Sequence, residues 1–267
     1  CYQEIISALD GASRQPLYLI TASHLVGRAE REILAQCAGF DRLRIVTLPQ
    51  LALEILRQQG HCVQVASGLE SRLLLRAAID DVADQLFYLK EAAHRQGFAN
   101  AVGETLAEIR SLGISLEEFI ELVGTEGFTS GLHRDLALVA QSYQQRMQEK
   151  DDSLSLLARA RLVLNRLERD NQSEISPSWE SSWRQARVWI LGLSLPTPLE
   201  LALLEEVALT CFETTIVLSD GETSQDPPTA LKQWMGRLQE KGCSVCKVPS
   251  VKASLEPALL PAVKIRV

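Results

Sequence analysis

Hydroxyl, imidazole and amide side chains follow two short apolar runs of the chain, Leu17–Thr21 and Arg44–Leu48. If both runs are parallel strands, these side chains lie at the carboxyl edge of a sheet, where open α/β sheets bind ligands. Small polar groups and helix N-terminal N–H groups at such an edge can hold the phosphates of a nucleic-acid backbone, and a nearby arginine adds positive charge. The candidate nucleic-acid contacts are therefore Thr21, Ser23, His24, Arg28, Thr47 and Gln50.

The same residues have a purely structural interpretation. A threonine at the end of a strand commonly caps the turn or helix that follows it, because its oxygen accepts a hydrogen bond from an unpaired backbone N–H. On spacing alone, Thr21 and Thr47 fit this role as well as they fit ligand binding.

Sequence signatures of nucleotide and hydrolytic chemistry are absent from the chain. It contains no GxxxxGK[ST] phosphate loop, no GxGxxG, no GxSxG and no HExxH. The four histidines lack metal-ligand spacing, and acidic pairs such as Glu117-Glu118, which follows Ser115, suit the first turn of a helix. We therefore expect neither a catalytic residue nor a metal site.

Cys243 and Cys246 form a CxxC, which can be a redox pair or half of a zinc site. A thioredoxin-type pair opens a helix after a strand, whereas this one lies where a strand begins. No second CxxC or histidine pair completes a zinc site. We interpret the pair as two thiols on a buried strand, with redox or zinc chemistry as the least favoured hypothesis.

The composition is that of a globular chain. Its 267 residues are 46% hydrophobic, enough for one large domain or two small ones. Six cysteines favour a reducing compartment over a disulfide scaffold, and no apolar run approaches the roughly 18 residues that span a bilayer. The net charge of −7 argues against a protein that coats nucleic acid with a basic surface. Because the chain begins with Cys1, we expect a piece of a longer protein.

Five short apolar runs predict the strands of an α/β sheet: Leu17–Thr21, Arg44–Leu48, Val188–Gly192, Thr214–Leu218 and Ser244–Val248. Such runs suit strands buried on both faces. Helical patterns at residues 25–36, 49–59, 197–210 and 230–240 separate most of them. The alternation favours βαβ crossovers and a mostly parallel, five-stranded sheet.

Residues 69–169 show helical periodicity instead. One apolar stripe on this block is Leu73, Leu74, Ala77, Ala78 and Val82, and another is Leu136, Val139, Ala140, Tyr143 and Met147. An insertion of this size forms a subdomain with its own small core. We expect an α/β domain at 1–68 and 184–250, a helical insertion at 69–183 that ends in a linker at 171–182, and a tail or linker at 251–267.

The order of these segments resembles a known family. The strand ending at Thr21, followed by Ala29–Glu32 and Ile45–Thr47, resembles two conserved blocks of superfamily 1 helicases of the UvrD/RecB kind. The closer resemblance is to the amino-terminal, helicase-like region of AddB/RexB-type subunits of ATP-dependent helicase–nucleases. The further segments that carry it are Leu106–Phe119, Asp135–Gln148 and Val188–Leu204.

The resemblance implies a P-loop-NTPase-like fold, with a helicase 1A-like α/β domain and a 1B-like helical insertion. A helix at Tyr2–Leu9 would have the position of the helix after a phosphate loop, so we expect such a loop, intact or decayed, before Cys1 in a parent chain. Active relatives use an acidic residue at the end of the third strand to help hold Mg²⁺, where this chain has Leu191 and Gly192. We expect the fragment to be inactive and to hold no cofactor, with ATP and Mg²⁺ used, if at all, by the parent protein.

Two functional hypotheses follow. The favoured one is a non-catalytic scaffold that binds single-stranded DNA in a cytoplasmic DNA repair and recombination complex, beside a helicase or nuclease partner subunit and without membrane contact. The alternative is a protein-interaction module derived from a helicase domain, which docks a partner subunit without binding DNA. The acidic net charge favours the alternative, because affinity for DNA depends strongly on phosphate contacts.

Overall fold

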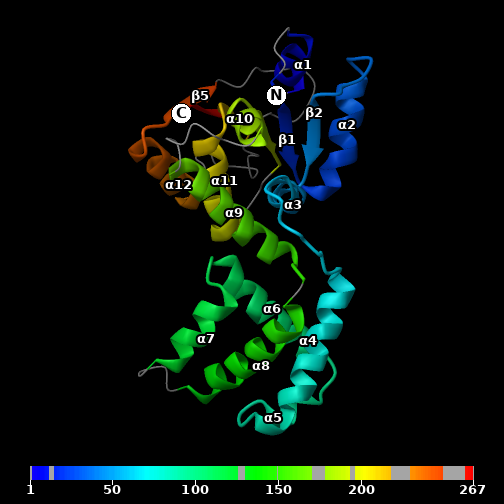
Figure 1. The fold of residues 1–267 in the computed structure, drawn as a ribbon, viewed down its shortest axis with the longest axis vertical. Coiled ribbons are helices and arrows are strands. Elements are labelled where there is room, and N and C mark those ends of the chain that lie inside the picture. Colours follow the sequence, from blue (N-terminus) through cyan, green and yellow to red (C-terminus); the bar gives the residue numbers. More distant parts are fainter. Residues whose placement is uncertain are drawn as a thin grey trace. The chain divides into compact units, whose positions relative to one another are not determined.

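The structure is a computed structural model that describes residues 2–11, 15–125, 130–148, 150–169, 178–192, 196–217, 229–248 and 262–266 (Figure 1). Its elements in chain order are α1 (Tyr2–Asp10), β1 (Leu17–Thr21), η1 (Ser23–Leu25), α2 (Val26–Leu34), β2 (Leu43–Val46), α3 (Leu48–Gln58), α4 (Gly68–Val82), η2 (Ala83–Gln85), α5 (Lys90–Ala93), α6 (Phe98–Ser111), α7 (Leu116–Gly124), α8 (Gly131–Met147), α9 (Ser153–Arg169), α10 (Ser178–Arg184), β3 (Arg187–Leu191), α11 (Pro198–Thr210), β4 (Glu213–Val217), α12 (Thr229–Glu240), β5 (Ser244–Val248) and β6 (Ala262–Arg266).

The chain divides into two compact units. Unit 1 comprises Cys1–Gln58, Ala160–Pro196 and Glu200–Val267, and unit 2 comprises Gln59–Arg159 with Thr197–Leu199. From the sequence we expected the boundaries after residues 68 and 183. The second boundary differs because α9 is one continuous helix across residues 159 and 160, so no break in the helical pattern marks it.

Within the residues that the structure describes, the sheet of unit 1 has six strands in the order β2-β1-β3-β4-β6-β5. The strands β2, β1, β3 and β4 are parallel, and β6 is antiparallel to both of its neighbours. All five predicted strands are present: β1 and β5 have the predicted bounds, and β2, β3 and β4 begin one residue earlier.

The predicted strand count of five is wrong, because part of the segment 251–267 forms β6 instead of a tail. From Val263 to Arg266 the sequence alternates apolar and basic residues, which is the period-2 pattern of a strand. The expected linker at 171–182 is also corrected in part, since Ser178–Arg184 forms α10. Residues 171–177 lie outside the described residues.

A hydrophobic core joins β1, β2 and β3 of unit 1 to α1 and α2. On α2, Ala29 and Ile33 are four residues apart and therefore face the same side of the helix, where both are fully buried. They pack with the buried residues Ile5, Leu17, Leu19, Leu43 and Trp189. Among the described helices, none is long and apolar enough to cross a membrane.

Unit 2 is built around the contact between α4 and α8, with α7 also packed against α8 (Figure 1). The buried residues of α4 are Leu75, Ala78, Ile79 and Val82, which follow the spacing of one helix face. On α8 the predicted stripe is confirmed, since each of its five residues is buried. The acidic pair after Ser115 is a helix start as predicted: the Ser115 hydroxyl accepts from the Glu118 N–H, and the Glu118 carboxylate accepts from the Ser115 N–H.

The chain segments that enter and leave unit 2 are joined to each other. The Ala66 N–H donates to the Asp151 carbonyl at 2.9 Å, and the Asp151 N–H donates to the Gln64 carbonyl at 2.7 Å. Next to this bridge, Arg110 makes a bidentate pair with Asp152, with both N···O distances at 2.6 Å. The ion pairs Lys150–Glu70 and Arg159–Asp151 flank it. The acidic pair Asp151-Asp152 therefore has a structural role.

The pKa of Asp152 reflects this pairing. Burial alone would raise it, but the hydrogen bonds and the charge of Arg110, with further hydrogen bonds from Ser155, outweigh burial and hold it below the ordinary value. Because the pKa is lower in the folded chain than in the unfolded chain, Asp152 stabilises the fold above the ordinary pKa of 3.8. This contribution is lost as the pH falls through the folded-state value.

We predict that Arg110→Ala lowers the free energy of unfolding by about 3 kcal/mol at neutral pH, because it leaves the largely buried carboxylate of Asp152 without its cation. Urea unfolding followed by circular dichroism measures the change. In the variant only the hydrogen bonds from Ser155 still oppose the effect of burial on the pKa of Asp152, so the loss of stability on acidification should begin at a higher pH than in the parent chain.

Arg76→Ala is the matched control. Arg76 pairs with Asp80 one helical turn away, and both side chains are substantially exposed, so its removal should cost less than about 1 kcal/mol. An equal decrease in the free energy of unfolding in both variants would show that the Arg110–Asp152 pair stabilises the fold no more than an exposed ion pair does.

Candidate functional site

The carboxyl ends of β2, β1 and β3 lie along one edge of the sheet in unit 1. Ile20 of β1 is in register with Val46 of β2, so the next residues of the two segments, Thr21 and Thr47, both lie at this edge. Thr21 is also in register with Leu191 of β3. The structure therefore brings the two predicted segments to one place.

Thr21 is buried at this edge, with 2% of its surface exposed. Its hydroxyl has no hydrogen-bond partner among the described residues, and η1, which follows, has Ala22 at its N-cap and no side-chain cap. The capping interpretation of Thr21 is therefore not supported. A ligand could reach this hydroxyl only if neighbouring side chains moved.

Gly192 lies against Thr21 and Leu25 and was not singled out as a site residue. It has a φ of +76°, and a Cβ atom placed on it would lie 2.4 Å from Leu25 Cδ1 and 3.8 Å from Thr21 Oγ1. A side chain at this position would therefore displace Leu25, the last residue of η1. Gly192 thus allows η1, which carries Ser23 and His24, to lie close to the end of β3.

Thr47 and Gln50 form a reciprocal cap at the start of α3. The Thr47 N–H donates to Gln50 Oε1 at 2.8 Å, and the Gln50 N–H donates to Thr47 Oγ1 at 3.4 Å. The capping interpretation of Thr47 is therefore confirmed. This bonding fixes the first turn of α3 and occupies the Thr47 hydroxyl and the Gln50 carbonyl oxygen.

Four of the six predicted contact residues are exposed: Ser23, His24, Arg28 and Gln50. Arg28 faces Glu32 one turn further along α2, at 4.0 Å, with both side chains about half exposed or more. Such a pair contributes little to stability and leaves the guanidinium accessible. Arg28 is thus the accessible cation of the predicted set.

Nearby positive charge is partly neutralised within unit 1. Arg44 pairs with Glu54 at 3.2 Å, and the Tyr18 hydroxyl donates to the same carboxylate at 3.3 Å. Burial, followed by the negative charge of Glu54, raises the pKa of Tyr18 to about 12, so this phenol remains a donor at neutral pH. Contacts to an anion at this edge would therefore come mainly from neutral donors and Arg28.

Among the described residues, no group of three or more His, Cys, Asp or Glu side chains could hold a metal ion. Cys243 is a buried free thiol, and burial raises its pKa. The side chain of Cys246 lies outside the described residues, so the interpretation of the CxxC stays a prediction.

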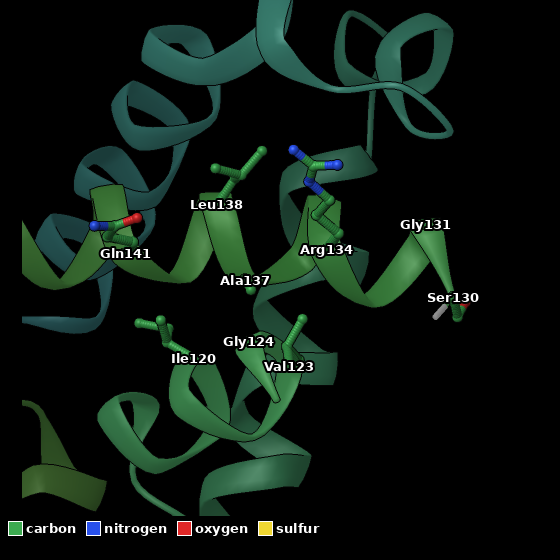
Figure 2. Close-up of a pocket in the computed structure, with 9 residues that line it drawn as sticks. All are labelled: Ile120, Val123, Gly124, Ser130, Gly131, Arg134, Ala137, Leu138 and Gln141. Carbon is green, nitrogen blue, oxygen red and sulfur yellow. The ribbon is translucent and has the colours of Figure 1, made fainter. Parts of the chain in front are cut away.

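A hollow of about 450 Å³ lies between α7 and α8 of unit 2 (Figure 2). Its lining is largely apolar, with Ile120 and Val123 from α7 and Ala137 and Leu138 from α8, and the polar residues Arg134 and Gln141 of α8 also border it. No chemistry is apparent from this set of residues. The hollow is separate from the predicted edge, which belongs wholly to unit 1.

The family described as "ADDB, N-terminal" matches residues 1–235. The chain belongs to this family. The resemblance that the segment order indicated is therefore confirmed, and it extends over both compact units.

Curated relatives of the chain share a name that describes each of them as a subunit of an ATP-dependent helicase/deoxyribonuclease. The protein of Heliobacterium modesticaldum is 27% identical over 255 residues, which cover 90% of this chain and 19% of that protein. The protein of Symbiobacterium thermophilum is 28% identical over 78% of this chain and 18% of its own length. That of Clostridium botulinum strain Hall is 24% identical over 82% and 18%. The chain thus spans less than one fifth of these relatives.

We predict that Gly192→Ala destabilises unit 1 by about 1–3 kcal/mol, because alanine disfavours a positive φ and its Cβ would overlap Leu25. Thermal and urea unfolding measure the loss. Gly27→Ala is the control: Gly27 lies in α2 with no atom near its Cβ position, so alanine should stabilise the helix by up to about 1 kcal/mol. Unchanged stability of Gly192→Ala would contradict the close approach described above.

Proposed function

We propose that this chain is the amino-terminal region of a helicase–nuclease subunit in DNA repair, where it acts as a non-catalytic scaffold for single-stranded DNA. The observation that carries the proposal is the meeting of the polar ends of β1 and β2 at one sheet edge. The name shared by the curated relatives supplies the nucleic-acid context. In this proposal the DNA backbone passes η1 and the first turns of α2 and α3.

Each predicted residue has a defined task in this proposal. Ser23, His24 and Arg28 offer exposed donors from η1 and α2. Thr47 and Gln50 act by fixing the first turn of α3, and the buried Thr21 by its place in the strand end beneath η1. The site would hold the backbone by shape and neutral donors, with one cation.

We also propose that this region does not hydrolyse ATP. Its third strand ends in Leu191, an apolar side chain that cannot help to hold Mg²⁺. Any ATP and Mg²⁺ would bind elsewhere in a parent protein with a P-loop-type sheet. The word "subunit" in the relatives' name supports a helicase or nuclease partner, and such a complex would work in the cytoplasm.

The alternative function, docking of a partner subunit without DNA, is favoured by one observation. Arg44 of β2, two residues before the carboxyl end of that strand, is already paired with Glu54, and Arg28 lies near Glu32, so little uncompensated positive charge remains near the site. Copurification with the partner subunit, without measurable binding of any oligonucleotide at low salt, would favour this alternative.

We predict salt-sensitive binding of a fluorescein-labelled single-stranded oligonucleotide, measured by anisotropy. If Arg28 contacts one phosphate, Arg28→Ala should weaken binding and reduce the slope of log affinity against log salt by about 0.7. Arg76→Ala removes a comparable i,i+4 pair from unit 2 and changes the net charge equally, so it should leave the slope unchanged. Equal slopes for the parent chain and Arg28→Ala would exclude this contact.

We further predict that the purified chain shows no DNA-stimulated ATP hydrolysis and no DNA cleavage with Mg²⁺ present, because it lacks a GxxxxGK[ST] loop. Phosphate release and gel assays provide the measurement. Activity that copurifies with the chain over two chromatographic steps would contradict the non-catalytic proposal.

A further inference from the structure

The segment between η2 and α5 of unit 2 exposes two aromatic rings next to each other. Phe87 has 80% of its surface exposed and Tyr88 has 64%. Their ring centroids are 5.1 Å apart at an interplanar angle of 74°, so the two rings meet edge to face. An aromatic pair this exposed contributes little to the core and is available to a ligand.

A buried carboxylate holds this segment in place. Asp135 of α8 is 2% exposed and accepts backbone hydrogen bonds from three successive residues. Its Oδ2 lies 3.1 Å from the Phe87 nitrogen, 2.7 Å from the Tyr88 nitrogen and 2.8 Å from the Leu89 nitrogen. Charge-assisted bonds of this kind are strong, so the backbone beneath the two rings is preorganised.

The surface of α8 is shaped to receive one of the rings. A Cβ atom on Gly131 would lie 1.9 Å from Tyr88 Cε2, so the Tyr88 ring lies directly across this glycine. On either side of the pair the chain is anchored in the core of unit 2, by the buried Leu86 and the partly buried Leu89. The two rings are therefore outward-facing side chains of a fixed segment.

Two cations accompany the rings. Lys90 follows Tyr88 by two residues, and Arg134 lies one helical turn after Gly131, beside Asp135. Figure 2 shows the Arg134 side chain extending from α8 on the side away from Ile120 and Val123 of α7. Both cations are exposed, and neither makes an ion pair with another residue in the described part of the chain.

Of the other arginine and lysine side chains of unit 2 that the structure describes, Arg72 and Arg95 are exposed without an ion pair, and five are paired with a carboxylate: Arg76, Arg110, Arg146, Lys150 and Arg159. In a chain of net charge −7, two accessible cations beside two exposed rings are a distinctive combination. Aromatic rings interleaved with unpaired cations suit a strand that offers both unstacked bases and phosphates. The buried centre of a protein–protein interface is instead depleted of charge.

We propose that Phe87 and Tyr88 form a stacking site for unpaired bases of single-stranded nucleic acid, and that Lys90 and Arg134 hold the neighbouring phosphates. The site lies in unit 2 and uses no residue of the sheet edge in unit 1. It therefore goes beyond the function proposed above, and the two can fail independently.

The test uses the whole 267-residue chain and short oligo-dT carrying 5-iodouracil. Phe87→Ala and Tyr88→Ala should each weaken binding in anisotropy by about five- to a hundredfold, the loss expected for one stacked base. Phe87→Trp should retain binding, because it keeps a stacking face. Leu73→Ala, which removes a comparably exposed apolar side chain from α4, should have no effect.

Two further readouts report on geometry. Photocrosslinks mapped by mass spectrometry should fall on Phe87 or Tyr88. Gly131→Ala should weaken binding although both rings remain, because its Cβ displaces the Tyr88 ring. Circular dichroism confirms that each variant is folded.

The outcomes separate the two proposals. If Arg28→Ala weakens binding and Phe87→Ala and Tyr88→Ala do not, the stacking site is wrong and the sheet edge stands. If Phe87→Ala and Tyr88→Ala weaken binding and Arg28→Ala does not, the stacking site is supported and the contact at the sheet edge is wrong. If the parent chain binds no oligonucleotide, or if the two aromatic variants lose only a partner protein in copurification, this inference is overturned.

Discussion

The fold depends on contacts that hold together the two chain segments through which the chain enters and leaves unit 2. The parallel strand β1 pairs with β2 on one side and β3 on the other, yet unit 2 lies between β2 and β3 in the sequence. The chain must therefore leave the sheet after β2 and come back to pair on the opposite side of β1. Two backbone hydrogen bonds between residues 64–66 and Asp151, with the Arg110–Asp152 pair beside them, fasten the departing and returning segments together. These contacts hold the two ends of the insertion together, so the long insertion adds little to the entropic cost of pairing β3 with β1.

Local pattern was enough to predict most of the elements, because buried parallel strands and amphipathic helices have distinct periodicities. It failed where tertiary context decides. The stripe expected on α4 included Leu73, which is 62% exposed, whereas the buried row runs through Leu75 and Ile79. In a helix this rich in leucine, several faces look apolar, and only the position of α8 selects one. Likewise, residues 262–266 form a strand because β4 and β5 each pair with them, and their own sequence does not reveal this pairing.

The sequence was enough to predict where the candidate site lies in the fold, but not which of its side chains are buried, hydrogen-bonded or exposed. That β1 and β2 end at the same edge follows from two parallel runs, whereas the close approach of Gly192 to Leu25 depends on a loop geometry that the sequence does not specify. The aromatic pair was missed for a related reason. Phe87 and Tyr88 look like core residues in the sequence, and the carboxylate that fixes them outward, Asp135, is 48 residues from Phe87 along the chain.

The antiparallel strand β6 also sets the order in which the sheet can be completed during synthesis. The first four strands in chain order, β1 to β4, pair with one another directly, so they can assemble as soon as β4 has left the ribosome. Within the described sheet, β5 pairs only with β6, which is made later. The nascent chain must therefore carry β5 as an unpaired strand, and β4 as an open edge, until residues 262–266 emerge. Slow translation over this interval would prolong exposure of both strands, which makes it the stage of synthesis at which a chaperone would matter most.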